Sequence, residues 1–233
     1  MKILAIDCSS VSVSAALCED EALLGEEFIH TRQVHSETLM PGVAALLDRC
    51  RVKPAEIGLF AVTAGPGSFT GVRIGVSAVK GLAVARDIPC AAVSPLEAAA
   101  AGVPFFDGIV CAVMDARRGQ FYNALFEGGE TRRLTPDRAI GVDELGDELR
   151  AAQKRVLLVG DGAKLCYNNL NATVPVTAAP DRVCYPRGAA IAALGLREYR
   201  AGKAISPAEL QPVYLRLPQA ERELRRRQAP PAE

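Results

Sequence analysis

The chain has 233 residues, 49% of them hydrophobic, and its 27 basic and 27 acidic residues cancel to a formal net charge of zero. This length and apolar content predict one large domain or two small ones with real cores. Because the charge is balanced, aromatic residues make up only 5% and tryptophan is absent, we do not expect autonomous binding to RNA or DNA.

The chain begins with an apolar strand, 2–6, that ends at Asp7 and is followed by the turn Cys8-Ser9-Ser10. Alternating apolar residues predict a second strand over 11–17, and a charged turn leads to a third strand, 22–29. Ser36 is the expected N-cap of a helix that reaches Cys50 and carries an apolar stripe. The predicted order is therefore three strands and then a helix.

A glycine-rich run, Gly65 to Gly75, separates a strand over 57–63 from a predicted helix over 71–86. Such turns bind phosphate when their backbone N–H groups converge at a helix N-terminus. The P-loop pattern requires a lysine after its last glycine, and this chain has Gly71-Val72-Arg73 there. The dinucleotide pattern G-x-G-x-x-G is missed by one residue. The run thus matches neither nucleotide-binding code.

The second half repeats the order of the first. A strand over 109–114 ends at Asp115, a turn over 116–119 follows, and strands over 120–126 and 131–134 flank a tight turn. A helix over 143–152, a strand over 156–159 and an Ala/Leu-rich helix over 188–200 come next. The aspartates that end the two strands are 108 residues apart and hold equivalent places, which favours a duplicated α/β domain over a chance resemblance of two meanders. We expect domains at 1–103 and 104–218, and a basic, solvated tail at 219–233.

Five motifs stand in order along the chain: Ile6-Asp7, His35-Ser36-Glu37, the glycine run, Asp115-Ala116-Arg117-Arg118 and Pro212-Val213-Tyr214-Leu215-Arg216. With these motifs the chain resembles the TsaB (YeaZ) family. The resemblance implies two tandem RNase H-like domains of the actin/hexokinase/Hsp70 (ASKHA) class. It also implies a non-catalytic subunit that supports the catalytic subunit TsaD in forming threonylcarbamoyladenosine on tRNA. TsaE, an ATPase, is the implied further partner, and tRNA is expected to be bound mainly through the complex.

Active members of this fold class bind ATP through acidic, glycine-containing turns after the first strand of each half. Here both aspartates are present, but Ser9 and Arg117 replace the glycines. The nucleotide or phosphate candidates are therefore weak: Asp7, Ser9, Gly67, Ser68 and Asp115. The alternative interpretation is that each aspartate caps its own turn. The rival function is a self-sufficient ATP-dependent phosphotransferase of the same fold.

No metal, cofactor or catalytic residue is predicted. The two histidines, His30 and His35, are five apart and do not share a helix face, and no Ser/His/Asp set can be assembled. The seven cysteines form no C-x-x-C pair, which is typical of free thiols in a reducing cytoplasm, and no apolar run is long enough to span a bilayer. We expect a cytoplasmic protein.

The helix after the glycine run has a narrow polar stripe, Arg73, Ser77 and Lys80, and is otherwise apolar or small. One apolar face would suffice to cover a sheet, so a second face is available either to another helix of the chain or to a partner. The resemblance implies that this helix and the helix over 36–50 form the interface for TsaD, and the same patch could also support a homodimer when the partner is absent. The predicted interface residues are Leu39, Val43, Leu46, Leu47, Val72, Val76, Val79 and Ala83.

Overall fold

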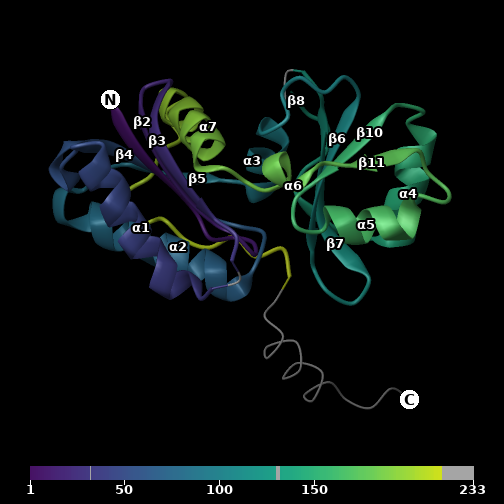
Figure 1. Cartoon of the computed structure of the whole chain (residues 1–233), viewed down its shortest axis with the longest axis horizontal. Helices are drawn as coiled ribbons and strands as arrows, with labels where there is room; N and C mark the ends of the chain where they lie inside the picture. Colours follow the sequence, from purple (N-terminus) through teal and green to yellow (C-terminus); the bar gives the residue numbers. More distant parts are fainter. Residues whose placement is uncertain (32, 130–131, 217–233) are drawn as a thin grey trace, which may run out of the picture.

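The computed structural model of the protein describes residues 1–31, 33–129 and 132–216. It has two lobes side by side, each built on one β-sheet (Figure 1). The first sheet has the order β3-β2-β1-β4-β5, antiparallel from β3 to β1 and parallel from β1 to β5. Its strands are β1 (Lys2–Asp7), β2 (Val13–Glu19), β3 (Ala22–Ile29), β4 (Ile57–Thr63) and β5 (Cys90–Val93).

The second sheet repeats this topology. Its order is β8-β7-β6-β10-β11, again antiparallel on one side of the central strand and parallel on the other, with β9 pairing β7. Its strands are β6 (Ile109–Asp115), β7 (Gln120–Glu127), β8 (Arg132–Arg133), β9 (Arg138–Gly141), β10 (Val156–Val159) and β11 (Val176–Ala178). The duplication predicted from the sequence is confirmed, because β1 and β6 occupy equivalent central positions.

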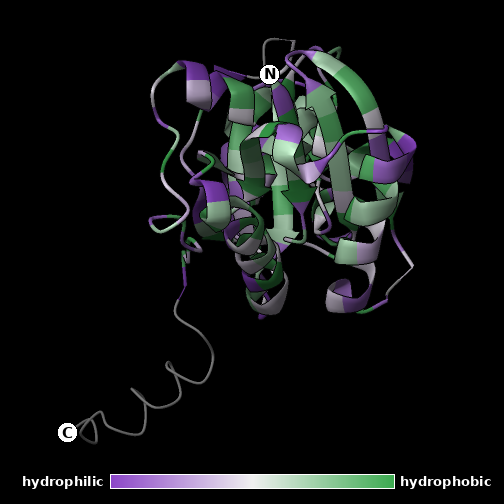
Figure 2. Ribbon diagram, turned by 90° about the vertical axis from the view of Figure 1, so that its left-hand side faces the viewer, coloured by the Kyte–Doolittle hydropathy of each residue, from purple (hydrophilic) through white to green (hydrophobic). Residues whose placement is uncertain are grey.

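The first sheet is covered on both faces. Along β1, Leu4 and Ile6 face the core under α1 (His35–Arg49) and α2 (Phe69–Ala83), whereas Ile3 and Ala5 face the opposite core. This alternation is the period of two that a strand imposes on its side chains. Figure 2 colours most strand residues as hydrophobic, as expected because a sheet buried on both faces needs apolar residues at successive positions.

The opposite face of the first sheet is covered by α7 (Gly188–Arg200), a helix from the far end of the chain (Figure 1). A Cβ on Gly195 would lie 2.5 Å from the Cβ of Ala61, so the helix backbone approaches β4 closely. The side chains of Glu26 and Ser14 accept hydrogen bonds from the N–H groups of Ala189 (3.1 Å) and Gly188 (2.9 Å) at its N-terminus. The first lobe is therefore built from two separate stretches of sequence, which the predicted boundary at 103/104 does not describe.

The second lobe has helices on its own sheet, and α3 links the lobes. Its core includes apolar side chains of α3 (Pro95–Ala101), α4 (Val142–Ala151) and α5 (Ala163–Leu170), and a short α6 (Asp181–Cys184) precedes α7. The carboxylate of Glu97 in α3 forms ion pairs with Arg133 of β8 and Arg197 of α7, both at 2.8 Å. No described helix is long and apolar enough to cross a membrane.

Several local predictions need correction. Val34, not Ser36, is the N-cap of α1, because the N–H groups of Glu37 and Thr38 already bond the Val34 carbonyl. The second helix starts at Phe69, two residues before the predicted start, and is followed by a 3-10 turn, η2 (Val84–Arg86); another, η1 (Pro54–Glu56), precedes β4. Helices α3 and α5 and strands β9 and β11 were not predicted. The predicted tail, 219–233, lies outside the described residues.

Candidate functional site

Asp7 ends β1 inside the protein and bonds its own turn. Its Oδ1 accepts hydrogen bonds from the Ser9 N–H (3.0 Å), the Ser9 hydroxyl (2.6 Å) and the Thr63 hydroxyl (2.6 Å). The side chain is fully buried, and its Oδ2 has no hydrogen-bond partner among the described residues. Burial raises the pKa of the Asp7 carboxyl, an effect that the bonds from Ser9 and Thr63 partly oppose. This is the turn-capping role that the sequence left as an alternative.

The equivalent turn in the second lobe has the same local bond but is more open. The Arg117 N–H donates to Asp115 Oδ1 at 2.7 Å, as the Ser9 N–H does to Asp7. The Asp115 N–H in turn donates to Asp161 Oδ1 at 3.3 Å. Burial raises the pKa of Asp161 to about 6. The two predicted aspartates thus lie at equivalent places of the duplicated fold, each capping its own turn.

The glycine run packs directly against the Cys8–Ser9 turn that follows β1. A Cβ on Gly71 would lie 2.0 Å from the Cys8 carbonyl oxygen, and one on Gly67 would lie 2.4 Å from the Ser9 carbonyl oxygen and 3.2 Å from Met114 Cε. The Ser68 N–H donates to the Ser9 carbonyl at 2.7 Å, and the Ser68 hydroxyl caps α2 by accepting from Gly71 N–H at 3.2 Å.

These contacts change the role of the run. Ser9, Gly67 and Ser68 are brought together, as a nucleotide site would require, but the N–H groups of Ser9 and Ser68 already donate to Asp7 and to the Ser9 carbonyl, and Gly67 packs against Ser9. The glycines allow α2 to approach the turn after β1 closely, because a residue without a Cβ leaves room for another backbone. The candidates of the first lobe, Ser9, Gly67 and Ser68, are therefore packed between the end of β1 and the start of α2, whereas Asp115 lies at the turn of the second lobe.

An open cleft of about 580 Å³ lies between the lobes. Val11 and His30 line it from the first lobe, and Asp161, Lys164 and Tyr185 are among the residues that line it from the second. The ring of His30 packs against that of Tyr185 at a tilt of 59°, with centroids 4.6 Å apart. None of Asp7, Ser9, Gly67, Ser68 or Asp115 lines this cleft. Asp115 is linked to it only through the hydrogen bond from its N–H to Asp161, so the four candidates of the first lobe and the cleft do not combine into one site.

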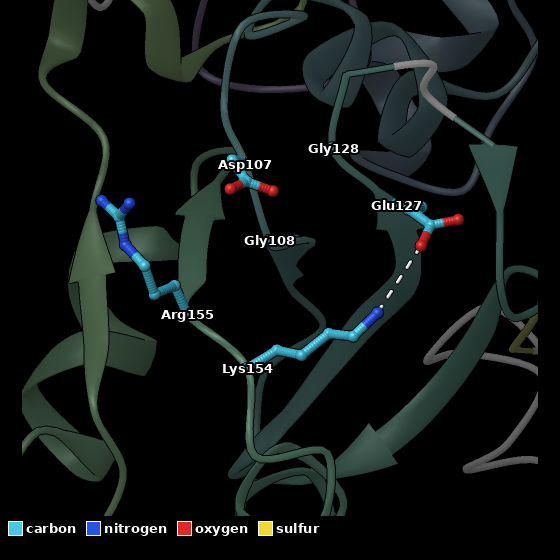
Figure 3. A pocket seen from close by; sticks show the side chains of 6 residues that line it. All are labelled: Asp107, Gly108, Glu127, Gly128, Lys154 and Arg155. Atoms are coloured by element: carbon cyan, nitrogen blue, oxygen red, sulfur yellow. Dashed lines mark ion pairs between the residues drawn. The ribbon is translucent and has the colours of Figure 1, made fainter.

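A second pocket, of about 530 Å³, lies at the edge of the second lobe (Figure 3). Its charged lining consists of Asp107, Glu127, Lys154 and Arg155. Glu127 pairs with Lys154 at 3.5 Å, as Figure 3 shows, and also with Arg132. Because the two carboxylates offset the two cations of the lining, the pocket presents little net charge to a ligand.

The cysteines and acidic residues do not define a reactive centre. All seven cysteines are free, and burial raises the thiol pKa of Cys18, Cys90 and Cys184 to about 11, so these thiols stay protonated and unreactive at neutral pH. His35 bonds the Ser10 carbonyl at 2.7 Å in a structural contact. Within the described ranges, no group of three or more His, Cys, Asp or Glu side chains is placed to hold a metal ion.

The eight predicted interface residues lie inside the first lobe. All belong to its own core, with exposed fractions from 0% for Val79 and Ala83 to 7% for Leu47. The apolar stripe that marked each helix is the stripe that packs on the sheet. These eight side chains are therefore not a surface for a partner. A protein that docks on α1 and α2 would meet the outward side of these two helices instead.

The outward side of α1 and α2 carries apolar, polar and charged residues, several of them small. On α1, Met40 is 40% exposed and is followed by the exposed Pro41 and Ala44. On α2, Arg73, Ser77 and Gly81 recur at intervals of four and are all exposed. A Cβ on Gly81 would have no heavy atom within 4 Å, so nothing in the described chain requires a glycine there.

The C-terminal segment 205–216 returns to the first lobe, which sequence reasoning missed. The Val213 N–H donates to the Ala64 carbonyl at 2.7 Å, and the Val213 carbonyl oxygen lies 2.3 Å from where a Cβ on Gly65 would be. Arg216 donates to the Ala116 carbonyl of the second lobe at 2.8 Å. The run Pro212–Arg216 was a signal in the sequence, but nothing in it specified which surface the segment would contact.

The architecture defines the class of protein: two tandem RNase H-like lobes of the ASKHA class. Residues 29–216 match the family model of TsaD, tRNA N6-adenosine threonylcarbamoyltransferase. The chain is 35% identical to the tRNA threonylcarbamoyladenosine biosynthesis protein TsaB of Bacillus subtilis, over 95% of this chain and 96% of that protein. Identity to TsaB of Escherichia coli is 27%, over 93% and 95% of the two chains. The chain belongs to the TsaB family.

Solved structures agree with this assignment. YeaZ from Pseudomonas aeruginosa superimposes with a TM-score of 0.77 at 26% identity, covering 92% of this chain and 99% of that one. A second Pseudomonas aeruginosa structure, described as similar to peptidase YEAZ, gives a TM-score of 0.79 at 27% identity with the same coverage. The family and the fold place the protein in the biosynthesis of threonylcarbamoyladenosine on tRNA.

Proposed function

We propose that this chain is a non-catalytic scaffold subunit that binds TsaD through the outward side of α1 and α2 and supports threonylcarbamoyl transfer to tRNA. The proposal follows from membership of the TsaB family and from a domain model that this chain shares with the transferase itself. Two proteins with related folds can pair through equivalent helices, which would give a four-helix interface. Binding of tRNA would then be a property of the complex, which TsaE would also join.

The observation that carries the proposal is the exposed glycine in the interior of α2. A glycine in a helix costs about 1 kcal/mol relative to alanine, and no contact within the described chain explains Gly81. A glycine on an exposed helix lets another backbone approach closely. Ser77, about one turn before Gly81, and Ala44 of α1 are also small and exposed, and Met40 of α1 adds an exposed, adaptable apolar side chain.

The rival function, ATP-dependent phosphotransfer by the isolated chain, has less support. Its phosphate cradle would have to form beside the Cys8–Ser9 turn, where the approach of Gly67 and Gly71 leaves no room for a Cβ. Titration of the isolated chain with Mg-ATP in a calorimeter tests it directly. Tight binding that Asp7→Ala abolishes would favour the phosphotransferase over the scaffold.

The scaffold function is tested by a matched pair of surface variants. Ala44→Glu places a carboxylate on the exposed outward side of α1, and Ala151→Glu places one on the exposed end of α4 in the second lobe. We expect the first to weaken TsaD binding by roughly 100-fold, because docking would bury an unpaired charge, and the second to have no effect. Modification of tRNA should fall with binding. Equal binding by both variants, or full modification without this chain, would refute the proposal.

A further inference from the structure

Arg73 of α2 is held in a fixed orientation by aromatic residues. Its Nε donates to the Tyr214 hydroxyl at 2.8 Å, and its guanidinium carbon lies 3.8 Å from the centroid of the Phe69 ring. The rings of Phe69 and Tyr214 are themselves 5.1 Å apart. The C-terminal segment thus contributes one wall of an arginine–aromatic cluster, defined here as Phe69, Arg73 and Tyr214.

No carboxylate of the described chain pairs with this arginine. Arg73 forms no ion pair there, and its Nη1 and Nη2 groups have no acceptor, whereas most arginines of the two lobes bond carboxylates. Lys80, about two turns further along α2, by contrast donates hydrogen bonds to the carbonyls of Ala208 (3.1 Å) and Leu210 (3.0 Å). Arg73 is therefore the cation of α2 that remains available to another molecule.

The cluster borders the proposed docking face. Arg73 lies on the same exposed stripe of α2 as Ser77 and Gly81, and Tyr214 and Val213 beside it are 39% and 49% exposed. Arginine and tyrosine are enriched among the residues that dominate binding energy at interfaces. A guanidinium fixed in advance by stacking also loses less side-chain entropy when it binds.

We propose that the Phe69–Arg73–Tyr214 cluster is an anchor of the docking face, and that it binds a carboxylate side chain of TsaD with its two free Nη groups. This inference rests on the proposed function, because it names the chemistry of the partner at one end of the same surface. It also assigns the C-terminal segment a role in recognition, since Tyr214 orients the arginine. A bidentate arginine–carboxylate pair fixes direction as well as attraction, so the cluster would set the register of the partner helix.

The test measures the affinity of the full chain for purified TsaD by calorimetry. Arg73→Glu should weaken binding roughly 10-fold to 100-fold, because it opposes two carboxylates. Tyr214→Phe keeps the ring on Phe69 but removes the acceptor for Nε, and should cost about 2-fold to 10-fold. Arg182→Glu is the matched control, since Arg182 is exposed on α6 in the second lobe and makes no ion pair within the described residues. It should bind as the wild type does.

Two further measurements keep the outcomes distinct. Arg73→Gln removes the charge without reversing it. The affinity of this variant for TsaD should depend much less on salt concentration than that of the wild type. Replacing one acidic residue of TsaD by lysine should restore binding to Arg73→Glu. If the wild type binds TsaD and Arg73→Glu binds equally well, the anchor is wrong while the scaffold stands. If the wild type does not bind, both fail; if Arg73→Glu alters only self-association, the occupant is a second copy and the anchor assignment is wrong.

Discussion

The carbonyl oxygen of Cys8 lies 2.0 Å from the position that a Cβ on Gly71 would occupy. The turn that follows β1 and the first turn of α2 are therefore in direct backbone contact. The contact explains why a sequence that looks like a phosphate loop need not bind phosphate, because the space next to β1 is taken by the helix that follows the loop.

Gly71→Ala should destabilise the protein by about 3 kcal/mol, since the clash is with backbone and neither segment can move without disturbing the core. The free energy of unfolding from urea denaturation measures the effect. Gly75→Ala is the control one turn later, where a Cβ would lie 3.5 Å from Val62 in an ordinary contact. If both variants are equally stable, the backbone contact at Gly71 is not a constraint on the fold.

Gly81→Ala should have opposite effects on stability and on docking. It should stabilise the isolated chain by about 0.5–1 kcal/mol, because alanine is the better helix former and its Cβ meets nothing. It should weaken the affinity for TsaD by about 5-fold to 10-fold, because the methyl group occupies the space of the approaching helix. Thermal unfolding and calorimetry check the two halves separately; a gain of stability with unchanged affinity would move the interface elsewhere.

Asp161→Asn should change how stability depends on pH. The folded pKa of Asp161 is raised from 3.8 to about 6, so its contribution is fully present below about pH 4 and is lost as pH rises through about 6. The neutral asparagine keeps an oxygen for the Asp115 N–H and avoids this loss. We expect the variant to gain roughly 1–2 kcal/mol on the wild type between pH 4 and 7, a figure reduced for partial exposure of the group.

Urea denaturation at a series of pH values measures this difference. Comparing the two proteins at each pH cancels the contribution of other groups, including Asp7, whose pKa is also raised. Parallel curves of unfolding free energy against pH for variant and wild type would show that ionisation of Asp161 does not destabilise the folded protein.

The fragment 1–103 should not fold on its own. One face of the first sheet is covered by α7, whose Ile191, Leu194 and Leu196 pack against β1 and β4 from the far end of the chain. Without α7 this apolar face is exposed, and we expect no cooperative unfolding transition and a tendency to aggregate. Joining residues 186–216 to the fragment through a flexible linker should restore a cooperative transition. Cooperative folding of 1–103 alone would instead support the boundary predicted from the sequence.

Much of the architecture was determined by the sequence itself. The strand–turn–strand order after Asp7 and again after Asp115 predicted the duplication, because local patterns of apolar residues and turns fix the strands one at a time. The missing lysine and the spacing of the glycines likewise predicted that Gly65–Gly75 is not a standard nucleotide loop.

Only the tertiary structure decided which surfaces face outward. Both sides of α2 are apolar or small, so periodicity marked Val72, Val76 and Val79 but did not tell whether a partner or the chain's own sheet covers them; the sheet does. The crossing of α7 and the seating of Tyr214 beside Arg73 were likewise decided by contacts between residues more than a hundred positions apart. Local pattern carries no information on such contacts, because they depend on which apolar faces remain uncovered once the sheets have formed.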